Sequence, residues 1–572
     1  MAGADEGTGL MHRPDAPAGR SKRADRVVVL ALVLLALAVR FGVVWSSGGL
    51  GALNGYDDGV YFSATTGLLH GLVPYRDFVL LHPPGMLVLA AGPISAAYAA
   101  GLSDSDALAV MRVLFVCLGG INTALVFLAG RHLSRVTGVV AGSLYAVWGP
   151  AIREERTMLL EAVVILGMLT ALALVPAVSN REVSGRWRPL VAGLVGGLAV
   201  ATKLWALVPV VLIFGALLVV GRWRRALAYA ASATAAAAAI AGPFLVLAPG
   251  PMWRMVVLAQ AGRPERGENR LARFAEMGNL SAWPFSVLAD PTLPTGPVDP
   301  NAAHEAFLAT GVGTAVTATV VVLAVVAAIV VAWRLPPART WVALLVVASV
   351  VLLATPIFYS GYASFVAPAA VLVLGAVAHL VWTSSAVRDR RVARVGVAAS
   401  ATVLLVLMTW GAVLTDRGAP IRPPLGPVVA DATCVASDSP AAIVLADRLR
   451  ANLDNGCPPV FDFSGVVYTF DRAGSGPAGP TQLREESAQF QAFVVNYFGR
   501  ADHVILRRRS GTGLSQDTMD LLASRPVLRS TYPRVYGPLG SSGTDATAAP
   551  ADESTDDGTD GDDADDADDD GA

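Results

Sequence analysis

The sequence is poor in charged residues, in lysine and in cysteine. Only 15% of its 572 residues are charged, whereas a soluble domain carries roughly a quarter. Hydrophobic residues make up 54%, and the mean hydropathy is +0.54. This balance excludes a soluble globular protein and indicates a polytopic membrane protein. The sequence also lacks internal repeats, which argues against transporter folds built from duplicated halves, and it has no zinc-ligand spacing, phosphate-binding loop, dinucleotide fingerprint or nucleophile elbow.

Apolar segments follow one another along the first 415 residues. No small-residue cleavage site follows the first segment, so we expect it to be a retained span rather than a signal peptide. A full span needs roughly 20 residues of helix, and several segments reach that length. The segments are 27–46, 85–101, 108–130, 136–152, 157–178, 190–202, 204–220, 226–248, 309–333, 340–358, 362–382 and 392–415.

Clusters of arginine orient these segments, because positive charge stays on the cytoplasmic side of a membrane. If segment 85–101 crossed the membrane, every later cluster would lie outside, so we expect this short, proline-containing segment on the outer interface. Segment 190–220 has arginines on both flanks and is predicted to form a short hairpin with Lys203 at its tip. The predicted fold is an all-α, multi-pass plasma-membrane bundle of about eleven spans with interfacial outer helices, its N-terminus cytoplasmic and its C-terminus outside.

Four regions are predicted along the chain. The C-terminal region, 541–572, carries 13 acidic residues and little apolar surface to bury, so we expect it to be disordered. The regions are a cytoplasmic N-terminal tail (1–26), the transmembrane domain (27–415), a small extracytoplasmic α/β domain (416–540) and the acidic tail (541–572).

The third region mixes strand and helix signals. We expect short strands, or residues beside them, at Val435, 443–445, 460–463 and 504–506, with helical stretches at 440–453 and 481–498. Two of the three cysteines, Cys434 and Cys457, fall in this region, whereas Cys117 lies inside a predicted span. Two cysteines on an oxidising face suggest a disulfide.

Two adjacent carboxylates, Asp57 and Asp58, follow the first span. Such a pair is costly beside a membrane, because the neighbouring like charge and the nearby lipid both oppose ionisation. The structural interpretation is a loop that caps a helix, with either residue as the N-cap. The functional interpretation is catalysis. Glu161 is a third carboxylate of this kind, since it lies inside the apolar run of a later span.

Lysine is almost absent from the chain, with only Lys22 and Lys203 among 43 basic residues. A sequence so rich in arginine would use arginine at position 203 as well, unless a compact and flexible ammonium were needed there. A snorkelling lysine is the structural alternative. We favour a ligand for a phosphate group, with Arg263 at the start of the second outer loop as its companion.

Three further side chains, Arg76, His82 and Arg156, are candidates for substrate binding. His82 has a structural alternative, the ordering of the Pro83-Pro84 turn, and Arg76 has another, an ion pair with Asp77. The adjacent carboxylates at 154 and 155 offer two metal ligands but no third, which is weak support for a divalent metal.

Carboxylates, a lysine and arginines at an outer membrane surface are suited to one kind of chemistry. A sugar carried on a lipid phosphate leaves behind an anion, which fixed cations stabilise. The acceptor hydroxyl must lose a proton, which requires a carboxylate base within hydrogen-bond reach. Because no nucleotide is available outside the cytoplasm, the donor must be carried by a lipid.

Five motifs follow one another along the chain: Asp57-Asp58, Gly71-x-x-Pro74-Tyr75-Arg76-Asp77-Phe78, His82-Pro83-Pro84-Gly85, Arg156-x-x-x-x-Glu161 and Thr202-Lys203. Together they resemble the GT-C glycosyltransferases, in particular the protein O-mannosyltransferase-like (family 39) enzymes and the lipid A aminoarabinose transferases. The resemblance covers roughly residues 27–275 and implies that Asp57 is the catalytic acid/base residue, that Asp58 and Glu161 occupy the other acidic positions, and that Lys203 contacts the lipid phosphate.

The predicted function is therefore a membrane hexosyl- or pentosyltransferase of the cell envelope that uses a polyprenyl-phosphate sugar donor. The expected partners are that donor, an acceptor hydroxyl on a glycan, lipid or protein, and membrane lipid, with no nucleic acid. A divalent metal is compatible with this chemistry but is not implied by it. The alternative is a flippase or transporter of lipid-linked sugars. A shared cavity for Asp57, Glu161 and Lys203 would favour the enzyme, because one substrate must reach all three.

Overall fold

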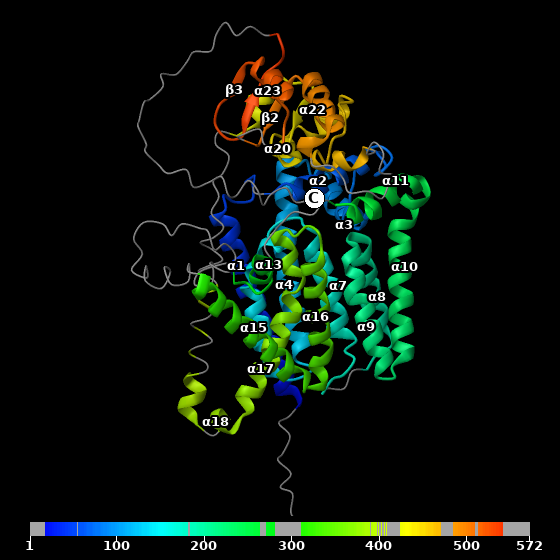
Figure 1. Ribbon diagram of the computed structural model, residues 1–572. Helices are drawn as coiled ribbons and strands as arrows, with labels where there is room; N and C mark the ends of the chain where they lie inside the picture. The colour runs from blue at the N-terminus through cyan, green and yellow to red at the C-terminus, as the bar shows by residue number, and fades with distance from the viewer. Residues whose placement is uncertain are drawn as a thin grey trace, which may run out of the picture.

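A computed structural model describes residues 18–53, 55–180, 184–263, 270–280, 311–388, most of 390–408, 424–470, 484–508 and 513–540. Figure 1 shows long helices running side by side in a bundle, a layer of shorter helices above them, and a small α/β domain at the top of the view. We call residues 424–540 the C-terminal domain. The protein is thus a helical membrane bundle joined to a small sheet-containing domain, as the sequence predicts.

Five of the described helices are long and apolar enough to cross a membrane. Four of these spans lie within α1 (Ala18–Ser46), α4 (Asp104–Gly130), α10 (Trp223–Leu247) and α15 (Gly311–Trp333). The fifth, Pro336–Ala354, ends with α16 (Arg339–Ala354). A sixth span results if α6 (Gly149–Glu155) and α7 (Leu160–Leu174), which meet at a bend of 114°, are counted together. The count of eleven spans stays a prediction, and most of segment 392–415 lies outside the described residues.

Shorter helices complete the bundle and its upper layer. Two of them, α8 (Trp187–Thr202) and α9 (Leu207–Val219), lie on either side of Lys203, where the sequence predicts a hairpin. The others are α2 (Asp57–Leu69), α3 (Gly85–Ala99), α5 (Arg135–Ala146), α11 (Pro249–Trp253), a π-helix (Arg254–Leu258), α12 (Ala259–Ala261), α13 (Arg270–Met277), α17 (Ala367–Thr383) and α18 (Ser385–Arg388), with 3-10 turns at Leu204–Ala206, Pro336–Ala338 and Ser360–Phe365.

Small residues allow the bundle helices to approach one another closely. Gly193 and Gly197 lie one turn apart on α8 and face α10. A Cβ atom on Gly193 would lie 1.9 Å from Ser232 Oγ, and one on Gly197 would lie 2.2 Å from Ala233 O. In lipid, where no hydrophobic force drives helices together, such close backbone contact supplies much of the packing energy. The α8 hairpin is therefore held firmly, and Lys203 at its end has a fixed position.

The upper layer is built from α2 and α3. Residues 58–67 of α2 are all buried, so this helix is covered on every side. Helix α3 contacts α2, α4 and α8 and begins directly after the His82-Pro83-Pro84 turn. A Cβ atom on Gly85 would lie 2.6 Å from both Ala201 O and Thr202 Oγ1. Gly85 therefore brings the start of α3 against the end of α8, next to Lys203.

The C-terminal domain contains a four-stranded sheet in the order β1-β2-β4-β3. Strand β1 (Val435–Ser437) pairs parallel with β2 (His503–Leu506), whereas β4 (Arg534–Tyr536) pairs antiparallel with both β2 and β3 (Val527–Arg529). Its helices are α20 (Pro440–Leu445), α21 (Leu449–Asp454), α22 (Ala488–Arg500) and α23 (Gln516–Ala523), with 3-10 turns at Gly426–Val429, Ser464–Thr469 and Arg484–Glu486.

Three predictions for this domain need correction. Residues 443–445 are helical rather than extended, because Pro440 starts a helix at its first position. The predicted helix 440–453 is two helices, since Asp447 adopts a positive φ of 55° between them. Residues 460–463 form no strand and lead into a 3-10 turn. Strands β3 and β4 were not predicted.

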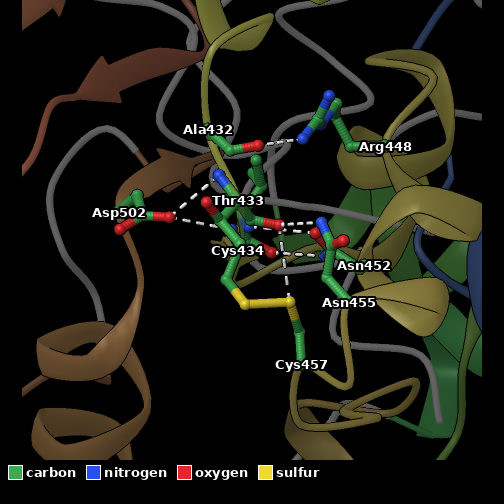
Figure 2. The surroundings of a disulfide bond; sticks show 9 residues. Ala432, Thr433, Cys434, Arg448, Asn452, Asn455, Cys457 and Asp502 are labelled. Carbon is green, nitrogen blue, oxygen red and sulfur yellow. Dashed lines mark hydrogen bonds between the residues drawn. A yellow bond between two sulfur atoms is a disulfide. The ribbon is translucent and has the colours of Figure 1, made fainter.

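A disulfide joins Cys434 and Cys457 beside β1 (Figure 2). Hydrogen bonds also hold the start of β1 near this disulfide. Asp502 Oδ2 accepts hydrogen bonds from the backbone amides of Thr433 and Cys434 at 2.9 Å each, and the Asn452 side chain bonds to both the amide and the carbonyl of Val435. The covalent link therefore lies in a segment that is already well ordered.

The C-terminal domain rests on the upper layer of the bundle (Figure 1). A Cβ atom on Gly59 of α2 would lie 2.2 Å from the Ala441 amide nitrogen of α20. At the edge of this contact, Arg450 Nε donates to Asp104 Oδ1 at 2.8 Å. The domain thus covers the helix that carries Asp57.

Candidate active site

Asp57 and Asp58 are the first two residues of α2, and Tyr56 is the N-cap. Neither carboxylate is therefore the N-cap that the structural interpretation required. Asp58 is fully buried, and its Oδ2 accepts from Arg112 Nη2 at 2.6 Å, Arg112 Nε at 3.1 Å and Thr157 Oγ1 at 2.6 Å. This carboxylate is held by α4 and by the α6–α7 junction.

Asp57 has very different surroundings. Its side chain is partly buried, and its Oδ1 is shielded from solvent without a hydrogen-bond partner among the described residues. Burial raises the pKa of Asp57 well above its usual value, and the charges of Asp462 and Glu161 raise it further, whereas Lys203 and Arg263 lower it. Asp57 is thus a carboxylate poised to take up a proton.

Lys203 lies at the junction of α8 and the following 3-10 turn and is only 6% exposed. Its ammonium forms an ion pair with Glu161 near the start of α7. The same Nζ lies 4.3 Å from the ring centroid of Tyr362 and 4.9 Å from that of Trp205. The carboxylate and the two aromatic faces stabilise a buried cation that would otherwise be costly.

Arg263 follows α12 and is 7% exposed. Its Nη1 donates to Tyr362 Oη at 3.2 Å, and its guanidinium lies 6.0 Å from the ring centroid of Tyr359 and 5.8 Å from that of Tyr468. Its Nε and Nη2 are buried and have no hydrogen-bond partner within the described part of the chain. A buried guanidinium with unused donors is suited to an anionic ligand.

His82 also faces this cluster. Its backbone carbonyl accepts from Tyr75 Oη at 2.7 Å, which ties the turn before α3. Burial, and next the charges of Lys203 and Arg263, lower the pKa of His82 well below its usual value. The imidazole is therefore neutral at pH 7.

The two remaining predicted candidates, Arg76 and Arg156, differ in their burial. Arg76 is exposed, and its Nε and Nη2 donate to the two carboxylate oxygens of Asp77 at 2.9 and 2.8 Å. Arg156 is the C-cap of α6 and is half-buried. Residues 153–155, which precede it, are the last residues of this helix.

The carboxylates at 154 and 155 have separate partners. Glu155 accepts from Arg40 Nε at 3.0 Å, Asn122 Nδ2 at 2.6 Å and Tyr145 Oη at 2.7 Å. Glu154 lies close enough to Glu161 for the two carboxyl groups to influence each other. Within the described residues, no group of three or more His, Cys, Asp or Glu side chains is arranged to hold a metal ion.

Four residues of the cluster were missed by the sequence analysis, namely Tyr56, Tyr362, Asp462 and Tyr468. Asp462 is 2% exposed and comes from the C-terminal domain, yet its charge acts on Asp57. The only signal in the sequence was an isolated carboxylate in the apolar run 460–463. Tyr56 lies beside the acidic pair, but its role depends on a contact with Asp462, which no local pattern indicates.

No protein-family model matches the chain, and no curated protein matches it by sequence. Solved structures do match. ArnT from Cupriavidus metallidurans, in the apo state, is 14% identical with a TM-score of 0.53 over 90% of this chain and 98% of that one. ArnT bound to undecaprenyl phosphate gives 15% identity and a TM-score of 0.52 over the same shares.

A third match is the archaeal oligosaccharyltransferase AglB from Archaeoglobus fulgidus, in complex with an inhibitory peptide and a dolichol-phosphate. It is 12% identical with a TM-score of 0.51 over 93% of this chain and 75% of that one. The chain spans only 32% of the length of one further match, the S. cerevisiae protein O-mannosyltransferase Pmt1-Pmt2 complex. ArnT and AglB are both GT-C enzymes, so the predicted resemblance is confirmed, and the chain is similar in fold to the GT-C membrane glycosyltransferases.

Proposed function

We propose that this protein is a membrane glycosyltransferase that moves a sugar from a polyprenyl-phosphate donor to an acceptor hydroxyl on the extracytoplasmic face of the membrane. The observation that carries the proposal is the position of Asp57 within one charged cluster with Glu161, Lys203 and Arg263. The cluster offers a base for the acceptor and cations for the leaving group.

In the proposed reaction, Asp57 takes the proton of the acceptor hydroxyl while that oxygen attacks the anomeric carbon of the sugar. The bond from the anomeric carbon to the phosphate oxygen breaks, its electron pair stays on the phosphate, and the configuration inverts. The raised pKa of Asp57 suits this role, because a base works best with a pKa near the operating pH.

Arg263 and Lys203 would hold the departing phosphate. The unused Nε and Nη2 donors of Arg263 support this role directly, because charge-assisted bonds to phosphate would satisfy them. Lys203 has Glu161 as its partner, so we propose that Glu161 keeps the ammonium in place rather than acting on the sugar. Both cations would stabilise charge that grows in the transition state.

Asp58 and His82 are proposed to support the site. Arg112 and Thr157 already donate hydrogen bonds to Asp58 Oδ2, so we propose that Asp58 anchors α2 and does not transfer a proton. The neutral His82 imidazole could accept or donate a hydrogen bond to substrate without adding charge.

Two structural neighbours support a lipid-phosphate donor. ArnT was solved with undecaprenyl phosphate, and AglB with a dolichol-phosphate. Both are lipid phosphates, which is the kind of molecule that the cluster of Lys203 and Arg263 would accommodate at the edge of the bundle.

Reconstitution tests the proposal. Purified protein in lipid vesicles would receive a panel of undecaprenyl-phosphate sugars and envelope acceptors, with mass spectrometry of products and release of undecaprenyl phosphate as readouts. We expect transfer with one-to-one release of the lipid phosphate. Movement of intact lipid-linked sugar between leaflets, with no release, would identify the flippase alternative instead.

The orientation of the bundle is also a proposal, supported by the arginine clusters at its predicted cytoplasmic ends. A membrane-impermeant thiol reagent tests it in a Cys117→Ser background, because Cys117 is the free cysteine of the described chain. A cysteine in place of Arg76 should react in intact cells, and one in place of Trp223 should react only after lysis. The reverse result would contradict the assignment.

A further inference from the structure

The first turn of the helix that carries Asp57 is tied to the C-terminal domain through Tyr56. This N-cap residue is 4% exposed and does not cap the helix with its side chain. Its hydroxyl instead donates to Asp462 Oδ1 at 3.0 Å and accepts from the Ser464 amide at 2.7 Å. The contact joins residues 406 positions apart in the sequence and lies directly beside Asp57.

The turn that holds Asp462 is itself rigid. The Gly465 amide donates to Asp462 Oδ1 at 2.8 Å, and a Cβ atom on Gly465 would lie 2.1 Å from Asp462 Oδ2. Ser464 Oγ accepts from Arg484 Nη1 at 2.7 Å. Asp462 is therefore a fixed point against which α2 can be held.

Asp462 also shares the electrostatic environment of the site. After burial, its charge is the largest of the influences that raise the pKa of Asp57. The groups that face Asp57 are Tyr61 of its own helix, Glu161 of α7, Lys203, Arg263 and Asp462; those that face Asp462 are Tyr56, Arg263, Tyr468 and Arg484. A carboxylate that only fastened two domains could lie anywhere along their contact, whereas this one lies within range of Asp57.

We propose that Asp462 is a positioning residue for Asp57: through its hydrogen bond with Tyr56 it fixes the first turn of α2, and with it the place of the Asp57 carboxylate. This inference rests on the proposed role of Asp57 as the base. It makes the C-terminal domain part of the catalytic machinery, because the membrane bundle alone would lack both the contact and the charge.

The matched control is a second contact between the same two parts of the molecule. Arg450 bonds Asp104 Oδ1 at 2.8 Å and the Leu102 carbonyl at 3.0 Å, and its guanidinium lies 4.2 Å from the ring centroid of Tyr98. Arg450→Ala therefore weakens docking of the domain without touching Asp57 or Tyr56. Any effect of loosened docking alone will appear in this variant.

The test compares Asp462→Asn, Tyr56→Phe, their double variant and Arg450→Ala in full-length protein in vesicles, with kcat, donor KM and the pH profile of kcat/KM as readouts. Asparagine can still accept the bonds from Tyr56 and Gly465, so Asp462→Asn removes mainly the charge. We expect a fall in kcat of about tenfold with little change in donor KM. The acid limb of the profile should move to lower pH, because losing a neighbouring negative charge lowers the pKa of the base.

Tyr56→Phe should also lower kcat, and the double variant should lose less than the product of the two single losses, since both act through one contact. Arg450→Ala should keep the wild-type pH profile. Binding of undecaprenyl phosphate, followed by thermal stabilisation, should survive in every variant and shows that the protein is folded.

An unmoved acid limb in Asp462→Asn, with losses no larger than those of Arg450→Ala, would overturn the positioning role. That outcome differs from failure of the proposed function, in which the wild-type protein itself transfers no sugar.

Discussion

Two buried polar regions of this protein use the same residue types in opposite ways. In one, Glu155 of α6 has hydrogen-bond donors from three other helices, namely Arg40 of α1, Asn122 of α4 and Tyr145 of α5. In the other, Asp57 keeps a buried oxygen without a partner, and Arg263 keeps two unused donors, as far as the described residues show. The first region is closed and the second is open to a ligand.

The closed region shows how a charge can be stable inside a membrane helix. Arg40 is fully buried in α1, and it also donates to the carbonyls of Ala36 and Ala146. Gly119 makes room for it, since a Cβ atom there would lie 2.3 Å from Arg40 Nε. The guanidinium nitrogens of Arg40 and both carboxylate oxygens of Glu155 have protein partners, so this ion pair does not call for a substrate. In the described residues, Asn122 Oδ1 is the buried atom of this network without a hydrogen-bond partner.

The comparison teaches that burial and charge do not by themselves identify a functional residue in a membrane protein. Asp57 and Asp58 are adjacent, and the Oδ1 of each is buried without a hydrogen-bond partner among the described residues, but Arg112 and Thr157 bond to Asp58 through its Oδ2. What distinguishes the candidate base, within the described part of the chain, is that it lacks an ion pair like the one between Asp58 and Arg112, in a place where an unpaired carboxylate is costly.

The largest expected effect is the loss of activity in Asp57→Asn. An amide preserves size and polarity but cannot accept the proton of the acceptor, and loss of a general base costs about 10²–10⁴-fold in rate. The measurement is transfer by purified protein alongside its melting temperature, which we expect to change little because Asp57 Oδ1 has no hydrogen-bond partner among the described residues to lose. Near-normal activity would move the base to Asp58 or Glu161.

Asp58→Asn is the matched control for that variant. Here the buried Arg112 loses its counter-charge, so the melting temperature should fall, whereas transfer per folded molecule should fall much less than in Asp57→Asn. Equal losses of transfer rate in both variants would contradict the assignment of Asp57 as the base and Asp58 as a structural residue.

A second prediction concerns the closed region. Arg40→Leu leaves Glu155 buried with only Asn122 and Tyr145 as donors, and breaking a buried ion pair in this way destabilises by about 3–5 kcal/mol. The measurement is unfolding in mixed detergent micelles. The Arg40→Leu/Glu155→Leu double variant should recover part of the loss, because it leaves no buried charge alone. Normal stability of the single variant would show that the pair contributes little.

A third prediction concerns Lys203. Lys203→Ala should weaken donor use by about 10²-fold, because it removes a buried cation beside a leaving group whose negative charge grows in the transition state. Lys203→Arg should restore only part of the activity, since a larger planar guanidinium must fit among Glu161, Trp205 and Tyr362. The measurement is the kinetics of donor use by each folded Lys203 variant. Wild-type kinetics in Lys203→Arg would contradict a specific phosphate role.

Much of the fold was predictable because it depends on local features. The arginine clusters on both flanks of 190–220 predicted a hairpin, and α8 and α9 lie there. The bend of 114° between α6 and α7 was not predictable, because the apolar pattern does not show how helices pack. Strands β3 and β4 have three residues each, too short for a period of two to stand out.

The candidate site shows the same division. Asp57, Glu161 and Lys203 were each conspicuous in the sequence, because a charge next to or within an apolar segment is rare, and Arg263 was chosen as a companion cation in the following outer loop. Asp462 was not, since its importance comes from a contact with Tyr56 across 406 positions. Residues supplied by a distant domain are found only once the chain is folded.

The smallest expected effect belongs to Arg76, which the sequence offered as a candidate for substrate binding. Its guanidinium is exposed and already bonded to Asp77, whose Oδ2 also accepts from the Val73 amide at 2.7 Å. An exposed ion pair of this kind contributes little, because water and salt screen it. Arg76→Ala should therefore leave transfer and melting temperature close to wild type, with a change in kcat/KM below about twofold. A loss comparable to that of Lys203→Ala would place Arg76 on the path of a substrate, and the division between open and closed polar regions would then have to include this exposed pair.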